Sequence, residues 1–325
     1  MNKKTMLMLL VVLTYIIAGC SSREEVGRIK LHRLDLALND YAHAGSIEKD
    51  SILAEYGDVL VSWGGILGLS QSDDSLINKC AKSRAIEVFT PDVIARFDDI
   101  DSIEKVLFKL ENNISKILNF SDNREYYAVV SPYTQSIYMS DSLMFVALNH
   151  YLGKDYPGYG YFENYQRITK TPKHLPYDIA EAIVKSKYPY QYRDGNTLLN
   201  VLLYNGAIMA AIMNIVPDAE EAEALGYSID QLLWLDENEK EAWNALIGRR
   251  LLYSTSMIDA DRLVKPSPST SILHQQCPGR AGRYIGYQIV KSFLENNKEM
   301  SVSQLLSPSF YNDNQSLIKS KYNGE

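Results

Sequence analysis

Ile17-Ala18-Gly19-Cys20, near the N-terminus, has the order that covalent lipid attachment requires: an aliphatic residue, two small residues and a cysteine. The small residues let a signal peptidase approach the scissile bond, and the cysteine thiol accepts a diacylglycerol. Two lysines precede an apolar run from Met6 to Ala18, which is too short to span a bilayer comfortably. We therefore predict a lipoprotein signal peptide over residues 1–19 and a lipidated, solvated tether over residues 20–27. A buried N-terminal helix with a chance cysteine is the alternative.

Lipid on Cys20 implies an anchored protein. A diacylglycerol plus an N-acyl chain gives lasting membrane attachment, whereas one acyl chain would be marginal. Ser21 provides no cue for retention in the inner membrane. We expect a bacterial envelope lipoprotein in the outer membrane that faces the periplasm. Arg23-Glu24-Glu25 is also compatible with a surface-export signal, although a solvated tether explains it more simply.

The sequence lacks the common catalytic and metal-binding motifs. The five histidines include no HxH or HxxxH pair, so no helix carries a ready pair of imidazole ligands. There is no G-x-S-x-G elbow and no Walker loop. We expect no cofactor and no metal site. Cys80 and Cys277 are compatible with a disulfide in an oxidising envelope and equally with two unpaired buried thiols.

The run from Pro278 to Gly286 contains arginines and glycines that suggest two interpretations. Gly282 and Gly286 lie one helical turn apart and would let a second helix approach closely, which we favour. The exposed start of that helix, with Arg280 and Arg283 nearby, is the alternative, because a helix N-terminus attracts anions.

Residues 151–192 contain nine tyrosines in a loop-rich stretch. Flat rings stack on sugars, so Tyr159, Tyr161 and Tyr165 are candidates for a glycan-binding surface. Tyrosines also pack the base of a loop while their hydroxyls stay hydrated, or form the centre of a protein interface.

The composition permits a large folded core. The chain has 325 residues, of which 46% are hydrophobic, and its net charge is −7. These values exclude intrinsic disorder, and the acidic balance without a basic block argues against a nucleic-acid partner.

Hydrophobic periodicity predicts one α+β domain over residues 28–325, with strands early and helices late. The apolar helix over 197–216 contains three asparagines, which favours a buried central helix over a transmembrane span. The expected strands are 28–36, 126–131, 135–139 and 143–148. The expected helices are 46–67, 91–97, 101–118, 176–188, 197–216, 228–235, 237–253, 282–296 and 301–306.

Besides the lipid-attachment motif, six segments of the sequence are informative together: Ile29–Asp35, Asp141–Gly153, Leu175–Val184, Thr197–Asn205, Pro278–Val290 and Leu317–Tyr322. With that motif, they resemble the gliding-motility lipoprotein GldB family of Bacteroidetes. The resemblance implies a zincin-like fold, with a small mixed sheet, N-terminal helices and a mostly helical C-terminal half.

The resemblance also implies where a zinc peptidase would hold its metal. The first site helix corresponds to Tyr177–Lys185, which contains neither of the required histidines. Asn205-Gly206 stands where a ligand glutamate is expected, and Lys185 would oppose a cation. We therefore expect a non-catalytic scaffold. A groove lined by Tyr177, Glu181 and Asn205 would then bind another envelope protein. A hydrolase that uses Glu181 or His174, and a glycan-binding lipoprotein, are the alternatives.

Overall fold

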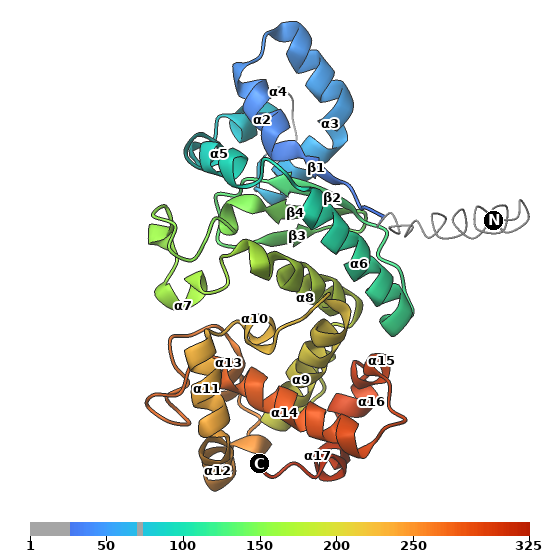
Figure 1. Ribbon diagram of the computed structural model, residues 1–325, viewed down its shortest axis with the longest axis vertical. Coiled ribbons are helices and arrows are strands. Elements are labelled where there is room, and N and C mark those ends of the chain that lie inside the picture. The colour runs from blue at the N-terminus through green and yellow to red at the C-terminus, as the bar shows by residue number, and fades with distance from the viewer. Residues whose placement is uncertain (1–26, 70–73) are drawn as a thin grey trace, which may run out of the picture.

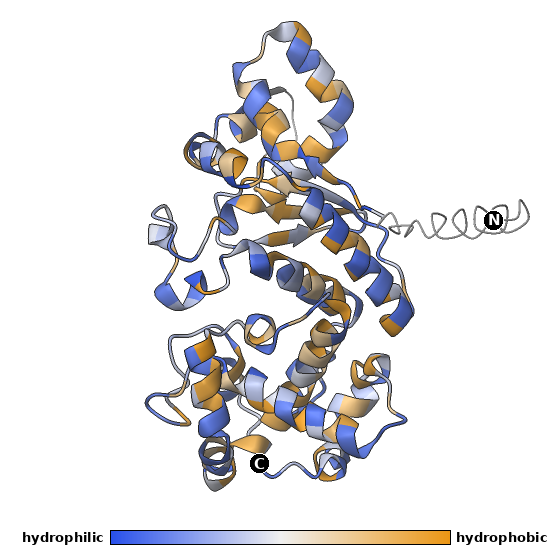
Figure 2. Ribbon diagram, viewed as in Figure 1, coloured by the Kyte–Doolittle hydropathy of each residue, from blue (hydrophilic) through white to orange (hydrophobic). Residues whose placement is uncertain are grey.

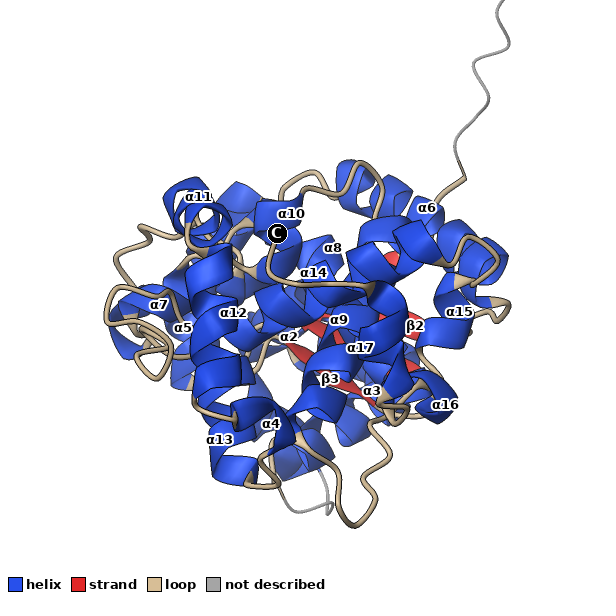
Figure 3. Cartoon of the chain, turned by 90° about the horizontal axis from the view of Figure 1, so that it is seen from below, coloured by secondary structure: helices blue, strands red, loops and turns tan. Residues whose placement is uncertain are grey.

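The computed structural model describes residues 27–69 and 74–325. The predicted signal peptide over 1–19, the lipidation site Cys20 and most of the tether lie outside the described residues. Helices surround a small central sheet (Figures 1 and 3). The expected α+β class, with N-terminal helices, a small mixed sheet and a helical C-terminal half, is confirmed.

The sheet contains four strands in the order β1-β2-β4-β3. β1 pairs parallel with β2, β2 pairs parallel with β4, and β3 pairs antiparallel with β4. β2 and β4 are buried on both faces, so they are nearly continuous apolar runs. In Figure 2 the sheet contains orange, hydrophobic stretches next to paler ones. The strands are β1 (Leu31–Arg33), β2 (Glu125–Val129), β3 (Ile137–Met139) and β4 (Leu143–Ala147).

Helices α2 to α5 form the N-terminal end of the molecule, and α6 lies beside the sheet (Figure 1). Leu107, Leu110, Ile114 and Leu118 of α6 are buried on one side, as the spacing predicts. These helices are α2 (Leu34–His43), α3 (Ser46–Ile66), α4 (Asp74–Ala81), α5 (Arg84–Arg96) and α6 (Asp101–Leu118).

Two predicted elements in this half are wrong in extent. The expected strand 28–36 ends at Arg33 because Leu34, Leu38 and Tyr41 are buried at helical spacing in α2. The expected helix start at Thr90 and Pro91 lies inside α5. That helix begins after Ser83, whose hydroxyl accepts a hydrogen bond from the Ile86 N–H at 3.4 Å.

Helices α9 (Leu198–Ile215) and α14 (Ala281–Asn296) form the centre of the C-terminal half. They cross where Gly206 meets Gly286: a Cβ on Gly206 would lie 2.0 Å from the Gly286 carbonyl oxygen. The prediction that Gly286 permits a close helix approach is therefore confirmed. By length and composition α9 could cross a membrane, but 83% of it is buried inside the protein. It is the buried central helix that the sequence predicts.

Shorter helices surround this pair and connect it to the sheet (Figure 1). The α-helices are α7 (Asn164–Arg167), α8 (Leu175–Lys187), α10 (Glu221–Leu225), α11 (Ile229–Glu237), α12 (Glu239–Gly248), α13 (Met257–Val264), α15 (Val302–Leu305), α16 (Pro308–Tyr311) and α17 (Gln315–Ser320). The 3-10 helices are η1 (Leu148–His150), η2 (Tyr159–Tyr161), η3 (Pro172–His174) and η4 (Leu251–Tyr253). Cys80 and Cys277 are both buried and unpaired.

Candidate functional site

Helix α8 carries a charged stripe on one face. Residues Asp178, Glu181 and Lys185 recur at three- and four-residue spacing, which brings them onto one side of a helix. The opposite side buries Ile179 and Ile183 in the core. Because the apolar face fixes the rotation of α8, the charged stripe must face the space between α8, α9 and the start of α14.

Two adjoining cavities occupy this space, with volumes of about 480 and 340 Å³. Both are lined by the same six residues: Thr169, Asp178, Glu181, Lys185, Pro266 and Arg280. We call the two cavities together the charged groove. The larger cavity is also lined by Asn205 and Arg283, and the smaller one by Ser136 and Lys170.

Glu181 lies between two cations at the centre of the charged groove. Lys185 Nζ is 2.5 Å from its Oε1, and Arg283 Nη2 is 2.9 Å from its Oε2. Burial alone would raise the pKa of this carboxyl, but Arg283 and Lys185 outweigh burial and hold the pKa well below its usual value. Glu181 is therefore ionised, with both oxygens already engaged.

Asp178 of α8 and His174, the last residue of η3, form a second ion pair. His174 Nε2 lies 3.4 Å from Asp178 Oδ1, and its Nδ1 lies 3.3 Å from Glu223 Oε2. Burial alone would lower the pKa of His174, but the charge of Asp178 and hydrogen bonds to both carboxylates raise it above 6.5. The Tyr151 hydroxyl donates to Asp178 at 2.8 Å.

Arg280 enters the charged groove from the residue that precedes α14. Its backbone is left-handed, with φ of 60°, which turns the chain into the helix. Arg280 lines both cavities. Burial lowers the pKa of its guanidinium, Arg283 adds to this lowering, and Glu181 opposes it.

Lys170 is 93% buried at the wall of the smaller cavity, since its exposed fraction is 7%. Its Nζ donates to Ser136 Oγ at 2.6 Å and lies 4.8 Å from the centre of the Phe162 ring. Burial lowers the pKa of Lys170; Asp178 opposes the shift and Arg280 adds to it. Burial, with the nearby Lys170, also lowers the pKa of His150 to about 3, so His150 is neutral.

The structure places four of the five predicted groove residues around one cavity: Glu181, Asn205, Arg280 and Arg283. Tyr177 lines neither cavity. It stacks on the His174 ring, and its hydroxyl accepts a hydrogen bond from the Glu220 N–H at 2.8 Å. Sequence reasoning missed Lys170 entirely. The spacing of Asp178, Glu181 and Lys185 is the signal from which the stripe could have been recognised.

Metal ligands do not converge here. Among residues 27–69 and 74–325, no three His, Cys, Asp or Glu side chains are arranged to hold a metal ion. The nearest approach is His174 with Asp178 and Glu223, but the two carboxylates contact opposite nitrogens of the ring. The two carboxylates and the imidazole ring of His174 therefore cannot coordinate the same ion.

Of the three tyrosines proposed for sugar stacking, Tyr159 and Tyr161 pack against each other, and Tyr161 is 42% exposed. Tyr159 is fully buried, and its hydroxyl donates to the Asn149 carbonyl at 2.8 Å. Its ring meets those of Tyr161 and Phe162 edge-on. This arrangement favours loop packing over a flat sugar-binding platform.

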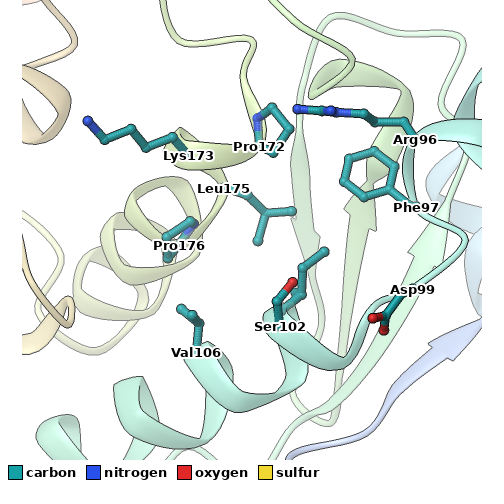
Figure 4. A pocket seen from close by; sticks show the side chains of 10 residues that line it. Arg96, Phe97, Asp99, Ser102, Val106, Pro172, Lys173, Leu175 and Pro176 are labelled. Atoms are coloured by element: carbon teal, nitrogen blue, oxygen red, sulfur yellow. The ribbon is translucent and has the colours of Figure 1, made fainter.

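A separate apolar cavity of about 390 Å³ lies between the end of α5, the start of α6 and α8. Figure 4 shows Phe97, Leu175 and Val106 directed toward its centre, and Lys173 extending away from it. Lys173, which pairs with Glu220 and Glu223, extends away from this cavity, whereas the ion pairs of Glu181 lie in the charged groove, which is therefore the candidate site.

These features define an α+β protein whose groove between α8, α9 and α14 is lined by partly buried ion pairs rather than by metal ligands. The family model for gliding motility protein GldB matches residues 20–324. The chain therefore belongs to the GldB family of gliding-motility lipoproteins, which implies a location in the cell envelope. Comparisons with curated proteins and with solved structures found no match.

Replacing Glu181 with glutamine is expected to destabilise the protein by about 3 kcal/mol, because the variant leaves the buried Arg283 guanidinium without its counter-charge. Unfolding in guanidinium chloride measures the loss. Glu237→Gln is the matched control, since Glu237 is exposed on α11. We expect it to change the free energy of unfolding by no more than about 0.5 kcal/mol. Equal stability of the two variants would show that the Glu181 pairing is energetically unimportant.

Proposed function

We propose that this GldB-family protein is a non-catalytic lipoprotein that binds other proteins of the cell envelope. In this proposal Cys20 carries the lipid, and the folded part faces the periplasm from the outer membrane. The observation that supports the non-catalytic role most directly is the pairing of Glu181 with Lys185 and Arg283. A carboxylate that is held by two cations is a poor general base and a poor cation ligand.

Exposed apolar side chains support a binding role. Ile229 and Leu233 lie one turn apart on α11 and are 62% and 53% exposed. Met257 on α13 is 51% exposed and also lines the larger cavity of the charged groove. Helices α11, α12 and α13 lie on the same flank in both views (Figures 1 and 3). Large apolar side chains exposed on neighbouring helices are typical of interaction surfaces.

Chemical cross-linking in cells, followed by affinity capture of the full-length lipoprotein, tests the proposal. We expect a reproducible set of envelope proteins whose recovery falls several-fold in the double variant Ile229→Lys, Leu233→Lys. Ile318→Lys is the control, since Ile318 is 66% exposed on α17. Recovery that is empty, or unaffected by the α11 variant, would contradict binding through this flank. A hydrolase activity of the purified lipoprotein that disappears in Glu181→Gln would contradict the non-catalytic role.

A further inference from the structure

The charged groove contains two cations without a carboxylate partner. Within residues 27–69 and 74–325, no carboxylate oxygen lies within 4.0 Å of the Lys170 ammonium or the Arg280 guanidinium. The buried Lys170 ammonium directly contacts a hydroxyl and a ring, and Asp178 acts on its charge only from beyond 4.0 Å. A buried charge without a counter-charge in direct contact is costly, so its presence in a groove suggests that something outside the chain supplies the nearest opposite charge.

The cations of the charged groove keep hydrogen-bond donors that no carboxylate of the described residues accepts. The Arg280 guanidinium is a planar fork that suits a carboxylate or phosphate, and Lys170 keeps N–H groups beyond the one that Ser136 accepts. The Nε of Arg283 is buried and has no hydrogen-bond partner among the described residues. By contrast, the carboxylates of Asp178 and Glu181 are already paired. Lys170 and Arg280, which line the charged groove, can therefore donate to an acceptor from outside the chain.

The size and lining of the charged groove suit a peptide segment rather than an isolated ion. Each cavity has several hundred Å³, and the six shared residues place the two cavities side by side. Apolar and aromatic side chains alternate with the charged ones along the walls, among them Ile137, Val201 and Tyr204. Such walls can hold the stem of a side chain and the adjoining backbone while the cations bind its charged end.

The charge balance favours a carboxylate over a phosphate dianion. Asp178 and Glu181 line the same cavities as Arg280, so a doubly charged ligand would lie close to two fixed negative charges. A single carboxylate can satisfy Arg280 and Lys170 with less repulsion.

We propose that the charged groove binds an acidic peptide segment of the partner protein, with a carboxylate of that segment seated between Lys170 and Arg280. This inference rests on the proposed function, because it specifies the chemistry of the partner that the lipoprotein binds. Lys170 and Arg280 are then binding residues, and Glu181 keeps Arg283 and Lys185 in place beside them.

Fluorescence anisotropy with the full-length lipoprotein in detergent tests the groove directly. The probes are short labelled peptides of equal length, one with glutamates and one with glutamines at the same positions. We expect the glutamate peptide to bind at least about tenfold more tightly, a difference of about 1.4 kcal/mol. Lys170→Met and Arg280→Gln should each remove this preference. Lys298→Met and Arg249→Gln are matched controls at exposed positions and should retain it.

Thermal unfolding separates lost binding from lost folding. Methionine fits the space of a buried lysine stem without a charge, so Lys170→Met should unfold at the same temperature or higher.

Equal binding of both peptides, or unchanged binding by Lys170→Met and Arg280→Gln, would overturn the proposal. So would competition by inorganic phosphate at concentrations at which acetate has no effect. Labelling of Ser136 by a fluorophosphonate would also overturn it, because that reaction requires a neutral Lys170 that acts as a base.

The same variants distinguish this proposal from the proposed function. If cross-linking recovers partners through the α11 flank but Lys170→Met and Arg280→Gln leave that recovery unchanged, the groove proposal fails and the proposed function stands. If neither the wild-type protein nor any variant recovers partners, the proposed function fails, regardless of how the labelled peptides bind.

Discussion

Cys20→Ala is expected to abolish lipid incorporation completely and to leave the protein at its precursor mass. The lipoprotein signal peptidase acts after the cysteine thiol has accepted the diacylglycerol, so a chain without that thiol keeps residues 1–19. Metabolic labelling with an alkyne fatty acid measures acylation, and intact-mass spectrometry measures processing. The expected effect is all-or-none, because no other side chain in the lipid-attachment motif is a nucleophile.

The remaining cysteines provide the control for this experiment. Cys80 and Cys277 are 2% and 0% exposed, and burial raises the pKa of the Cys80 thiol to about 11 and that of Cys277 to about 12. Thiols held protonated in the core are poor acyl acceptors. Cys80→Ala and Cys277→Ala should therefore keep full acylation. Fatty-acid label that persists in Cys20→Ala would contradict anchoring through this residue.

Local periodicity predicted the long elements well, because a single stripe or run of apolar residues defines each of them. The expected bounds of α6, residues 101–118, are those of the structure. The predicted elements that were wrong are those in which tertiary packing decides between two local conformations of a segment, such as strand and helix. Ile29 and Leu31 alternate as in a strand, but Leu34 has helical spacing with Leu38 and Tyr41 and therefore lies in α2.

The site was predictable only where the chain itself carries a pattern. Arg280 and Arg283 stood out because they lie at a helix start, whereas Glu181 and Asn205 were implied by the family resemblance. Lys170 follows a short helix with no motif around it, and its role depends on Ser136 and Phe162, which come from separate loops. Such a contact exists only after the fold has formed, so no spacing rule could have indicated it.

Gly286→Ala is expected to destabilise the protein by at least about 3 kcal/mol and to lower its Tm by about 5–10 °C. A Cβ at this position would lie 2.1 Å from the carbonyl oxygen of Leu202, which is backbone of α9. Rotation of a side chain cannot relieve that clash, so α9 and α14 must separate. Because these helices form the centre of the C-terminal half, their separation also exposes the apolar surface packed around them. Thermal unfolding followed by circular dichroism measures the effect.

Gly57→Ala is the matched control, since Gly57 lies inside the long helix α3 and a Cβ there would meet nothing within 4 Å. Alanine restricts the unfolded chain and favours helix, so this variant should gain up to about 1 kcal/mol. The two substitutions are chemically identical, and the opposite signs of their effects isolate the contact between the helices. If Gly286→Ala were as stable as Gly57→Ala, close approach at Gly206 would not be what determines the packing of α9 against α14. The charged groove, which both helices help to line, would then not depend on that crossing.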